Sequence, residues 1–273
     1  MAVQNFIPAL WSARLLANLD KGHVLGNIVN RDYEGEIKQY GDRVKIALIG
    51  DVTIGDYDGT DIDGPEDLTL EARELLIDQQ KYFNFQVDDV VQAQSNITLM
   101  DKGMARASQA LSQTVDEAIA QKYVEAGKQV GDDDAPISLT AENIYDNIVD
   151  LGVALDETNT PRDGRFIAVP AYVHGLLQKS DAFVSANNEI ARNGFVGKVA
   201  GFEVFVSNNI AKVGDNDKIL AGHKMAITMA EQILEVEGYR PEKRFSDAVK
   251  GLHVYGIGVT QPDALAVMTA TRG

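Results

Sequence analysis

Residues 97–126 read ITLMDKGMARASQALSQTVDEAIAQKYVEA, and they carry the strongest helical pattern in the chain. Apolar side chains recur there every three or four residues and form one stripe, which consists of Met100, Met104, Ala107, Leu111, Val115, Ala118 and Ile119. Gly127 follows directly and predicts the end of the helix. A helix of about 28 residues is roughly 42 Å long, whereas a globular helix usually has about 11–12 residues. We therefore interpret it as a spine of the molecule.

The residues before this helix predict a long β-hairpin. Between residues 33 and 89 apolar and polar side chains alternate, as in a strand with one buried face. The apolar positions are Val44, Ile46, Leu48, Val52, Ile54, Leu75, Ile77, Phe83, Phe85 and Val87. Residues 55–65 (GDYDGTDIDGP) separate the two runs and are rich in turn formers and acids. Because an isolated two-stranded hairpin is only marginally stable in water, we expect this one to lie on something else.

A short amphipathic helix is predicted over residues 7–21. It contains the only tryptophan, Trp11, and its leucines recur at helical spacing up to Leu19. Gly22 follows as the expected C-cap. A helix of this length cannot bury so much apolar surface alone, so we expect it to fold back on its own core or to dock on a neighbour.

The residues after the long helix have an α/β pattern. Residues 131–136 (GDDDAP) predict a linker and the best domain boundary. A helix is predicted from about 140 to 155, followed by a short buried strand at 166–169 and a second helix that starts at Pro170. The buried face of the first helix is expected to consist of Ile144, Ile148, Leu151 and Leu155. From residue 234 to 268 the pattern is again that of β-strands.

The charge of the chain excludes some partners. The chain has 273 residues, no cysteine and a net charge of −16. Two windows without a basic residue, 46–72 and 129–161, hold eight acids each, and these sixteen acids equal the whole excess. A chain this acidic repels polyanions, which argues against sequence-specific nucleic-acid binding and against an anionic membrane surface. The lack of cysteine excludes disulfides and thiolate chemistry.

No pattern indicates a catalytic, cofactor-binding or metal-ligating site. No two histidines stand at the spacing of a metal site; they are His23, His174, His223 and His253. If Gly64 were the sixth residue of an EF-hand loop, the first and twelfth would be Gly59 and Leu70, which lack the required carboxylates. A solvated loop is therefore expected there, and a divalent ion held loosely between neighbouring chains is the alternative.

No segment predicts a membrane span or a secretion signal. No run approaches about 18 consecutive apolar residues, and the first basic residue is Arg14, so the start lacks the pattern of a signal peptide. We therefore expect a soluble protein that is made in the cytoplasm.

Several segments resemble the major capsid proteins of tailed bacteriophages. They are residues 6–16 (FIPALWSARLL), 29–37 (VNRDYEGEI), 41–46 (GDRVKI), 77–85 (IDQQKYFNF), 87–89 (VDD), 250–256 (KGLHVYG) and 262–265 (PDAL). The likeness covers nearly the whole chain, and the joint order of the segments is far more specific than any single one.

The resemblance implies an α+β fold of the Hong Kong 97 type. Its parts would be an N-terminal arm (1–32), an extended β-hairpin loop (33–80), a peripheral domain (81–136 with 234–273) and an axial α/β domain (137–233). The long helix, about 97–126, would be the spine helix of the peripheral domain.

The resemblance also implies a function. The protein would be a structural protein, not an enzyme, whose copies self-assemble as hexamers and pentamers into an icosahedral shell around double-stranded DNA. Scaffolding and portal proteins would be its partners, and a decoration protein is a further candidate. The shell would enclose DNA without sequence-specific binding and without a membrane. The protein would be assembled in the host bacterial cytoplasm and would end up in the virion.

Contacts between subunits are expected to involve the hairpin and the arm. The candidate contact residues are Trp11, Arg14, Arg43, Lys45, Asp56, Asp58, Asp61, Asp63, Glu66 and Asp67. The acids among them form the hairpin tip and would meet basic residues of a neighbour. The candidates for that role are Arg14, Arg31, Arg43, Lys45, Arg240, Lys243 and Arg244. Such contacts would steer assembly more than supply affinity.

Two other functions remain as alternatives. A bacterial nanocompartment shell, similar to encapsulin, has the same fold but encloses enzymes, and fold alone does not fix function. A soluble α/β binding or hydrolytic protein with its site at 137–233 is the less favoured alternative, because its motifs are missing.

Overall fold

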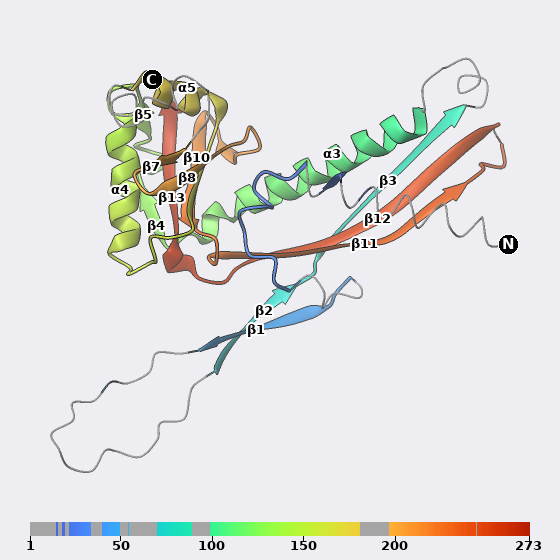
Figure 1. Ribbon diagram of the computed structural model, residues 1–273, viewed down its shortest axis with the longest axis horizontal. Helices are drawn as coiled ribbons and strands as arrows, with labels where there is room; N and C mark the ends of the chain where they lie inside the picture. The colour runs from blue at the N-terminus through green and yellow to red at the C-terminus, as the bar shows by residue number, and fades with distance from the viewer. Residues whose placement is uncertain are drawn as a thin grey trace, which may run out of the picture.

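The computed structural model describes residues 15, 18–19, 22–33, 40–49, 54, 70–88, 99–180, 197–243 and 245–273. Statements about structure below refer to these residues. Figure 1 shows a small α/β body at one end, a long helix beside a long sheet, and a thin hairpin that runs away from both.

The spine helix is confirmed, and it is shorter than the sequence predicts. Helix α3 spans Leu99–Ala120 and continues as the 3-10 helix η2, Gln121–Glu125. Its 22 residues make a rod of about 33 Å. The chain leaves the helix because Gly127 donates its N–H to the Pro262 carbonyl at 2.9 Å. A Cβ atom on Gly127 would lie only 2.7 Å from that oxygen, so the close approach requires glycine.

A three-stranded antiparallel sheet runs beside α3 (Figure 1). Its strands, in spatial order, are β11 (Ile227–Tyr239), β12 (Ser246–Val259) and β3 (Gln79–Asp88). The face toward α3 is apolar, and it packs in one cluster composed of Leu15, Met100, Met104, Ile233, Val236, Val249, Phe83, Phe85 and Val87. Gly103 allows helix and sheet to meet closely, because a Cβ there would lie 2.5 Å from the Phe85 ring.

A mixed eight-stranded sheet forms the α/β body. Its path is β4-β13-β10-β6-β8-β7, with β5 paired to β13 and β9 paired to β10. The strands are β4 (Lys128–Val130), β5 (Ile137–Leu139), β6 (Arg165–Val169), β7 (Lys198–Val199), β8 (Phe202–Val206), β9 (Lys212–Val213), β10 (Asn216–His223) and β13 (Leu265–Arg272). Helices α4 (Ile144–Asp156) and α5 (Ala171–Lys179) pack on this sheet.

The predicted buried face of α4 is confirmed. Ile144, Ile148, Leu151 and Leu155 are fully buried and pack with Ile167, Ile219 and other sheet residues. A second core joins this body to the spine, because Leu25, Val115, Ile119, Phe166 and Tyr255 belong to one buried cluster. The α/β body and the long sheet therefore share apolar contacts through the C-terminal half of α3.

The last strand belongs to a different sheet than the sequence division implies. That division groups residues 234–273 together, but β13 pairs with β10 and β4 in the α/β body. The 3-10 helix η3 (Pro262–Ala264) carries the chain from one sheet to the other. Six successive residues from Leu265 are buried, and such a continuous apolar run fits a central strand of either sheet.

The third sheet is the hairpin of β1 (Arg43–Ile49) and β2 (Leu70–Leu76), which confirms a strand on each side of the acidic loop. Residue pairs run from Arg43 opposite Leu76 to Ile49 opposite Leu70. Figure 1 shows it extending away from the rest of the subunit.

The end of the N-terminal segment differs from the expected C-cap. Gly22 is helical and is not among the glycines with positive φ. A Cβ on Gly22 would lie 2.6 Å from the Ser112 hydroxyl. Glycine is therefore required there by the close approach of α3, a reason that the expected C-cap did not include.

We predict that Ile148→Ala destabilises the subunit strongly, because it empties a fully buried position of α4. A loss of about 2–5 kcal/mol in the free energy of unfolding is expected from chemical denaturation. Val149→Ala, one residue away and 38% exposed, should change it by less than about 1 kcal/mol. Equal losses in the two variants would contradict the described orientation of α4.

Candidate subunit-contact surfaces

One face of the hairpin is anchored to the long sheet. Val44, Ile46, Leu75 and Ile77 are buried and pack with Ala230 and Val254. Two backbone hydrogen bonds close the base, from Gly41 N–H to the Ile77 carbonyl (2.9 Å) and from Ile77 N–H to the Asp42 carbonyl (3.0 Å). The hairpin is therefore held at its base, and Arg73 in the middle of β2 adds a hydrogen bond from its Nη1 to the Val259 carbonyl (3.2 Å).

The opposite face of the hairpin base is exposed and mainly basic. Arg43 and Lys45 alternate with the buried residues of β1 and so point to this side. Register places Leu76 and Glu74 beside them. The Arg43 Nη1 atom lies 2.9 Å from Glu74 Oε2, and both side chains are exposed. We call this surface, with Arg43, Lys45 and Glu74, the basic strip. Its two cations and one anion give it one excess positive charge.

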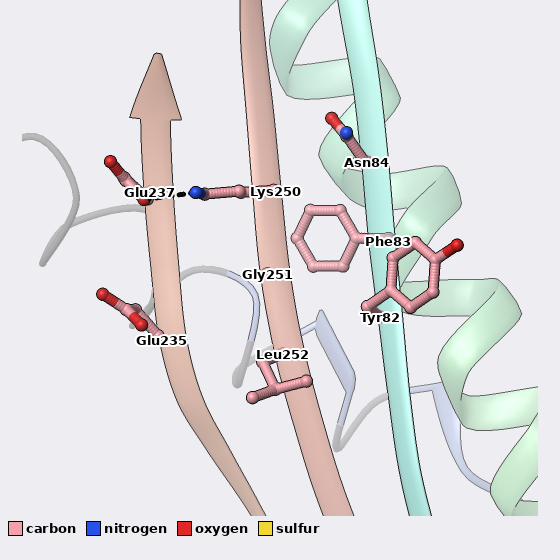
Figure 2. A pocket seen from close by; sticks show the side chains of 8 residues that line it. All are labelled: Tyr82, Phe83, Asn84, Glu235, Glu237, Lys250, Gly251 and Leu252. Atoms are coloured by element: carbon pink, nitrogen blue, oxygen red, sulfur yellow. Dashed lines mark ion pairs between the residues drawn. The ribbon is translucent and has the colours of Figure 1, made fainter.

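The long sheet has an open face on the side away from α3. Phe83 and Phe85 pack toward α3, so their neighbours Tyr82 and Asn84 point the other way. Figure 2 shows the cavity there, of about 260 Å³, with Leu252 and the charged residues of β11 around it. Lys250 Nζ lies 2.7 Å from Glu237 Oε2, and this contact raises the pKa of Lys250.

Two large aromatic side chains on this sheet are exposed. Tyr82 of β3 is 79% exposed, and Phe245, beside the start of β12, is 86% exposed. Single exposed apolar residues are ordinary on a monomer surface. These two are nevertheless positions where a neighbouring subunit would gain apolar contact.

A buried charge cluster joins four parts of the chain, and sequence reasoning missed it. Its centre is Glu231 of β11, whose Oε1 lies 2.8 Å from Arg31 Nη2 and 3.2 Å from His23 Nε2. The other oxygen, Oε2, lies 3.0 Å from Nε2 of His253 in β12. Arg31 thus has a partner within its own subunit, and its role toward a neighbour's acidic tip stays a prediction.

Asp116 of α3 extends the cluster. It accepts hydrogen bonds from the Val24 N–H (2.9 Å) and the Gly26 N–H (3.0 Å), and its Oδ1 lies 3.4 Å from His23 Nδ1. His23 therefore lies between two carboxylates, Asp116 and Glu231, and all three are buried. The sequence contained one indication of this cluster, because Ser108, Ser112 and Asp116 recur every four residues along the buried stripe of α3. Taken one at a time, these polar residues look like ordinary surface positions of a helix.

The cluster shifts the pKa values of His23 and Glu231. Burial by itself would lower the pKa of His23, but the two carboxylates outweigh it and raise this pKa to about 9. Burial would likewise raise the pKa of Glu231, but its contacts with His23 and His253 lower it to about 2. The cluster therefore combines a protonated His23 imidazole with the ionised carboxylate of Glu231 near neutral pH.

Of the ten candidate contact residues, the structure describes two. Arg43 and Lys45 lie together on the basic strip. The other eight lie outside the described residues, so their role stays a prediction; they are Trp11, Arg14, Asp56, Asp58, Asp61, Asp63, Glu66 and Asp67. Among the additional basic candidates, the Arg240 Nε atom lies 3.5 Å from Asp247 Oδ1 in the same chain.

The described residues contain neither a metal-binding group nor a membrane-spanning helix. No group of three or more histidines and acids there is arranged to hold a metal ion. None of the described helices is both long and apolar enough to cross a bilayer.

Comparison with known proteins gives one consistent group. A family model described as "Phage capsid protein" matches residues 72–268. A solved structure from Mycobacterium phage Che8 is 30% identical, with 90% of each chain covered and a TM-score of 0.73. The capsid structure of cyanophage P-SCSP1u is 17% identical, with a TM-score of 0.66 over 92% of this chain and 87% of that one.

A virus-like particle from Pyrococcus furiosus has the same fold. It is 15% identical, with a TM-score of 0.59 over 96% of this chain and 99% of that one. At such identities the cyanophage and Pyrococcus structures show the fold alone. No curated protein matches the sequence.

We predict that Leu75→Ala loosens the hairpin, because Leu75 is 2% exposed and belongs to its anchor. Burial of this size contributes about 2–5 kcal/mol, so cleavage by trypsin at Arg43, Lys45 or Arg73 should accelerate at least about tenfold. The matched control is Leu76→Ala, which changes a neighbouring leucine on the exposed face. Equal cleavage rates for both variants would contradict the anchoring.

Proposed function

The chain belongs to the phage capsid protein family, and from this membership we propose how its copies contact one another. It is a structural protein, not an enzyme, that self-assembles into the icosahedral shell enclosing phage double-stranded DNA, and it is located in the virion capsid. The observation that carries this function is the family match over residues 72–268 together with 30% identity to the Che8 phage structure. The nanocompartment alternative is not favoured, because only the fold links the chain to the Pyrococcus particle.

The proposed contact is a hairpin of one subunit lying across the next. The hairpin base is anchored, and its second face is exposed, so a neighbouring copy is the partner that its strands lack. Such a contact joins two different surfaces, and it repeats from subunit to subunit until a ring or shell closes. Hexamers and pentamers are the rings proposed here.

The charges of the two surfaces suggest which of them meet in this contact. The acidic tip, Asp56 to Asp67, has no basic residue, and the basic strip around Arg43 and Lys45 has an excess positive charge. We assign the tip of one subunit to the strip of another, or to another basic candidate such as Arg14. Trp11 would add an apolar contact from the arm. Contacts of this type steer encounter and set register.

The domain division and the other partners are also part of the proposal. The arm (1–32), extended loop (33–80), peripheral domain (81–136 and 234–273) and axial domain (137–233) would have the roles of a Hong Kong 97-type subunit, with the last strand of the peripheral range, β13, joining the sheet of the α/β body. Scaffolding and portal proteins, and a decoration protein, would bind the shell during assembly in the bacterial cytoplasm. A net charge of −16 suits a wall that encloses DNA without binding its sequence.

Electron microscopy of the protein, expressed alone and with a co-expressed scaffolding protein, tests the function. Closed shells of uniform diameter are expected in at least one of the two preparations. A monodisperse monomer in both preparations would contradict the proposed self-assembly.

A charge reversal tests the proposed contact. The double variant Arg43→Glu with Lys45→Glu should assemble about tenfold more slowly at low salt, because the strip would then repel an acidic tip. Added salt should restore part of the rate. Subunit folding should persist in circular dichroism, since the exposed Arg43–Glu74 pair contributes about 1 kcal/mol at most.

The control for this reversal is Lys102→Glu with Arg106→Glu, which reverses two exposed charges on α3. Its assembly rate should stay near that of the unmodified protein. If both double variants slow assembly equally, the strip has no specific role.

A further inference from the structure

The charge cluster of His23, Arg31, Asp116, Glu231 and His253 ties the N-terminal segment to the rest of the subunit. His23 and Arg31 come from residues 22–31, and their partners come from α3, β11 and β12. Exposed charge pairs contribute little, but a buried carboxylate that loses its partner is costly. The position of residues 22–31 therefore depends on whether every member of the cluster keeps its partner.

His23 is the member whose charge the cluster needs most. It alone touches both carboxylates, Asp116 through Nδ1 and Glu231 through Nε2. A neutral imidazole carries one N–H and can donate to only one of them. Nδ1 is hydrogen-bonded to Asp116, whereas the 3.2 Å contact of Nε2 with Glu231 is an ion pair without hydrogen-bond geometry. Loss of the proton thus removes one of the two N–H groups and the positive charge that attracts both buried carboxylates.

The other partners do not replace that donor equally. Glu231 keeps Arg31 and His253, whereas Asp116 keeps only backbone N–H groups, those of Val24 and Gly26, among the contacts described. Both of these N–H groups belong to the same segment as His23. A weakened Asp116 contact therefore acts directly on the segment that His23 belongs to.

We propose that this cluster is a pH-sensitive latch, which holds residues 22–31 on α3 and the long sheet while His23 is protonated and lets them open more often once His23 is neutral. The element that opens is local. Apolar contacts of Leu25, Ile28 and Val29 oppose the opening at every pH, and so do the backbone hydrogen bonds that join Asn30 to Ile227 and Met229. The latch thus changes how often the segment opens, and it does not by itself unfold the subunit.

The direction of the pH effect follows from the cluster. The pKa of His23 is about 9 in the closed state, above its ordinary value of 6.5, so its contribution is complete below pH 6.5 and is lost as pH rises through 9. The pKa of Glu231 is lowered from 4.5 to about 2, so its contribution is complete above 4.5 and is lost toward pH 2. The contributions of both groups are therefore complete between pH 4.5 and pH 6.5, where the latch is strongest.

Other charged or titratable groups near His23 do not reverse this direction. Arg31 stays charged throughout this pH range. Lys81 of β3 lies opposite His253 in the sheet register, and so it belongs to the neighbouring strand and not to the segment of His23. The Tyr255 ring lies beside His253, and burial raises the pKa of its hydroxyl, so it stays neutral below pH 9. The carboxylates of Asp116 and Glu231 face His23 from α3 and β11.

Hydrogen–deuterium exchange of the full-length protein between pH 6 and pH 9 tests the latch. After correction for intrinsic exchange rates, protection in peptides covering Val24 and Gly26 should fall on the order of 100-fold, while α4 peptides keep theirs. His23→Gln should show low protection at pH 6 and no further fall. The matched control, His174→Gln in α5, should keep the wild-type fall, because His174 pairs with Gln178 outside the cluster.

Glu231→Gln is a second variant, which keeps the size of the side chain. Because one carboxylate is removed, the midpoint of the fall should move toward the ordinary pKa of histidine, about 6.5. Unchanged protection of residues 22–31 in the unmodified protein from pH 6 to 9 would overturn the latch, and this measurement needs no variant. An unaltered fall in His23→Gln would overturn it as well.

Discussion

The carboxylate of Asp116 fixes where the spine helix of this capsid protein lies. It is a buried side chain of α3, and among the described residues its hydrogen-bond donors come from residues 23–26. Because a buried carboxylate without donors is costly, α3 and this segment can pack in essentially one register. Ser112 and Ser108, one and two helical turns earlier, support the same register, because their hydroxyls donate hydrogen bonds to the Leu19 and Leu15 carbonyls.

The rest of the subunit depends on that register. His23 reaches Glu231 only while the segment stays on α3, and Glu231 in turn meets His253 in the next strand. The apolar face of the long sheet then lies on Met100 and Met104. One face of this sheet and one face of the hairpin base are left exposed as a result. A single subunit is therefore incomplete in the way expected of a protein whose remaining partners are copies of itself.

The elements with strong periodicity could be predicted from the sequence. The spine, the two hairpin strands and the face of α4 follow from apolar spacing alone. The helix end could not be placed, since Gln121 to Glu125 continue the pattern while tightening to a 3-10 helix. The sheet of β13 also escaped prediction, because a continuous apolar strand carries no information on its neighbours.

The candidate contact surfaces were predictable only in part. Alternation along β1 puts Arg43 and Lys45 on one exposed face, and the structure places them there. The buried cluster was not predictable, because its members are scattered from His23 to His253. Each of them alone resembles an ordinary polar residue, and only the fold brings them together. The resemblance to phage capsid proteins supplied the function, which no single motif in the sequence carries.

An electron cryomicroscopy reconstruction of the assembled protein would show whether the surfaces exposed on one subunit are the contacts between subunits. We expect a closed icosahedral shell in which the β1–β2 hairpin lies on a neighbouring subunit and the strip around Arg43 and Lys45 is covered. A shell in which each hairpin folds back on its own subunit and the strip faces solvent would contradict it.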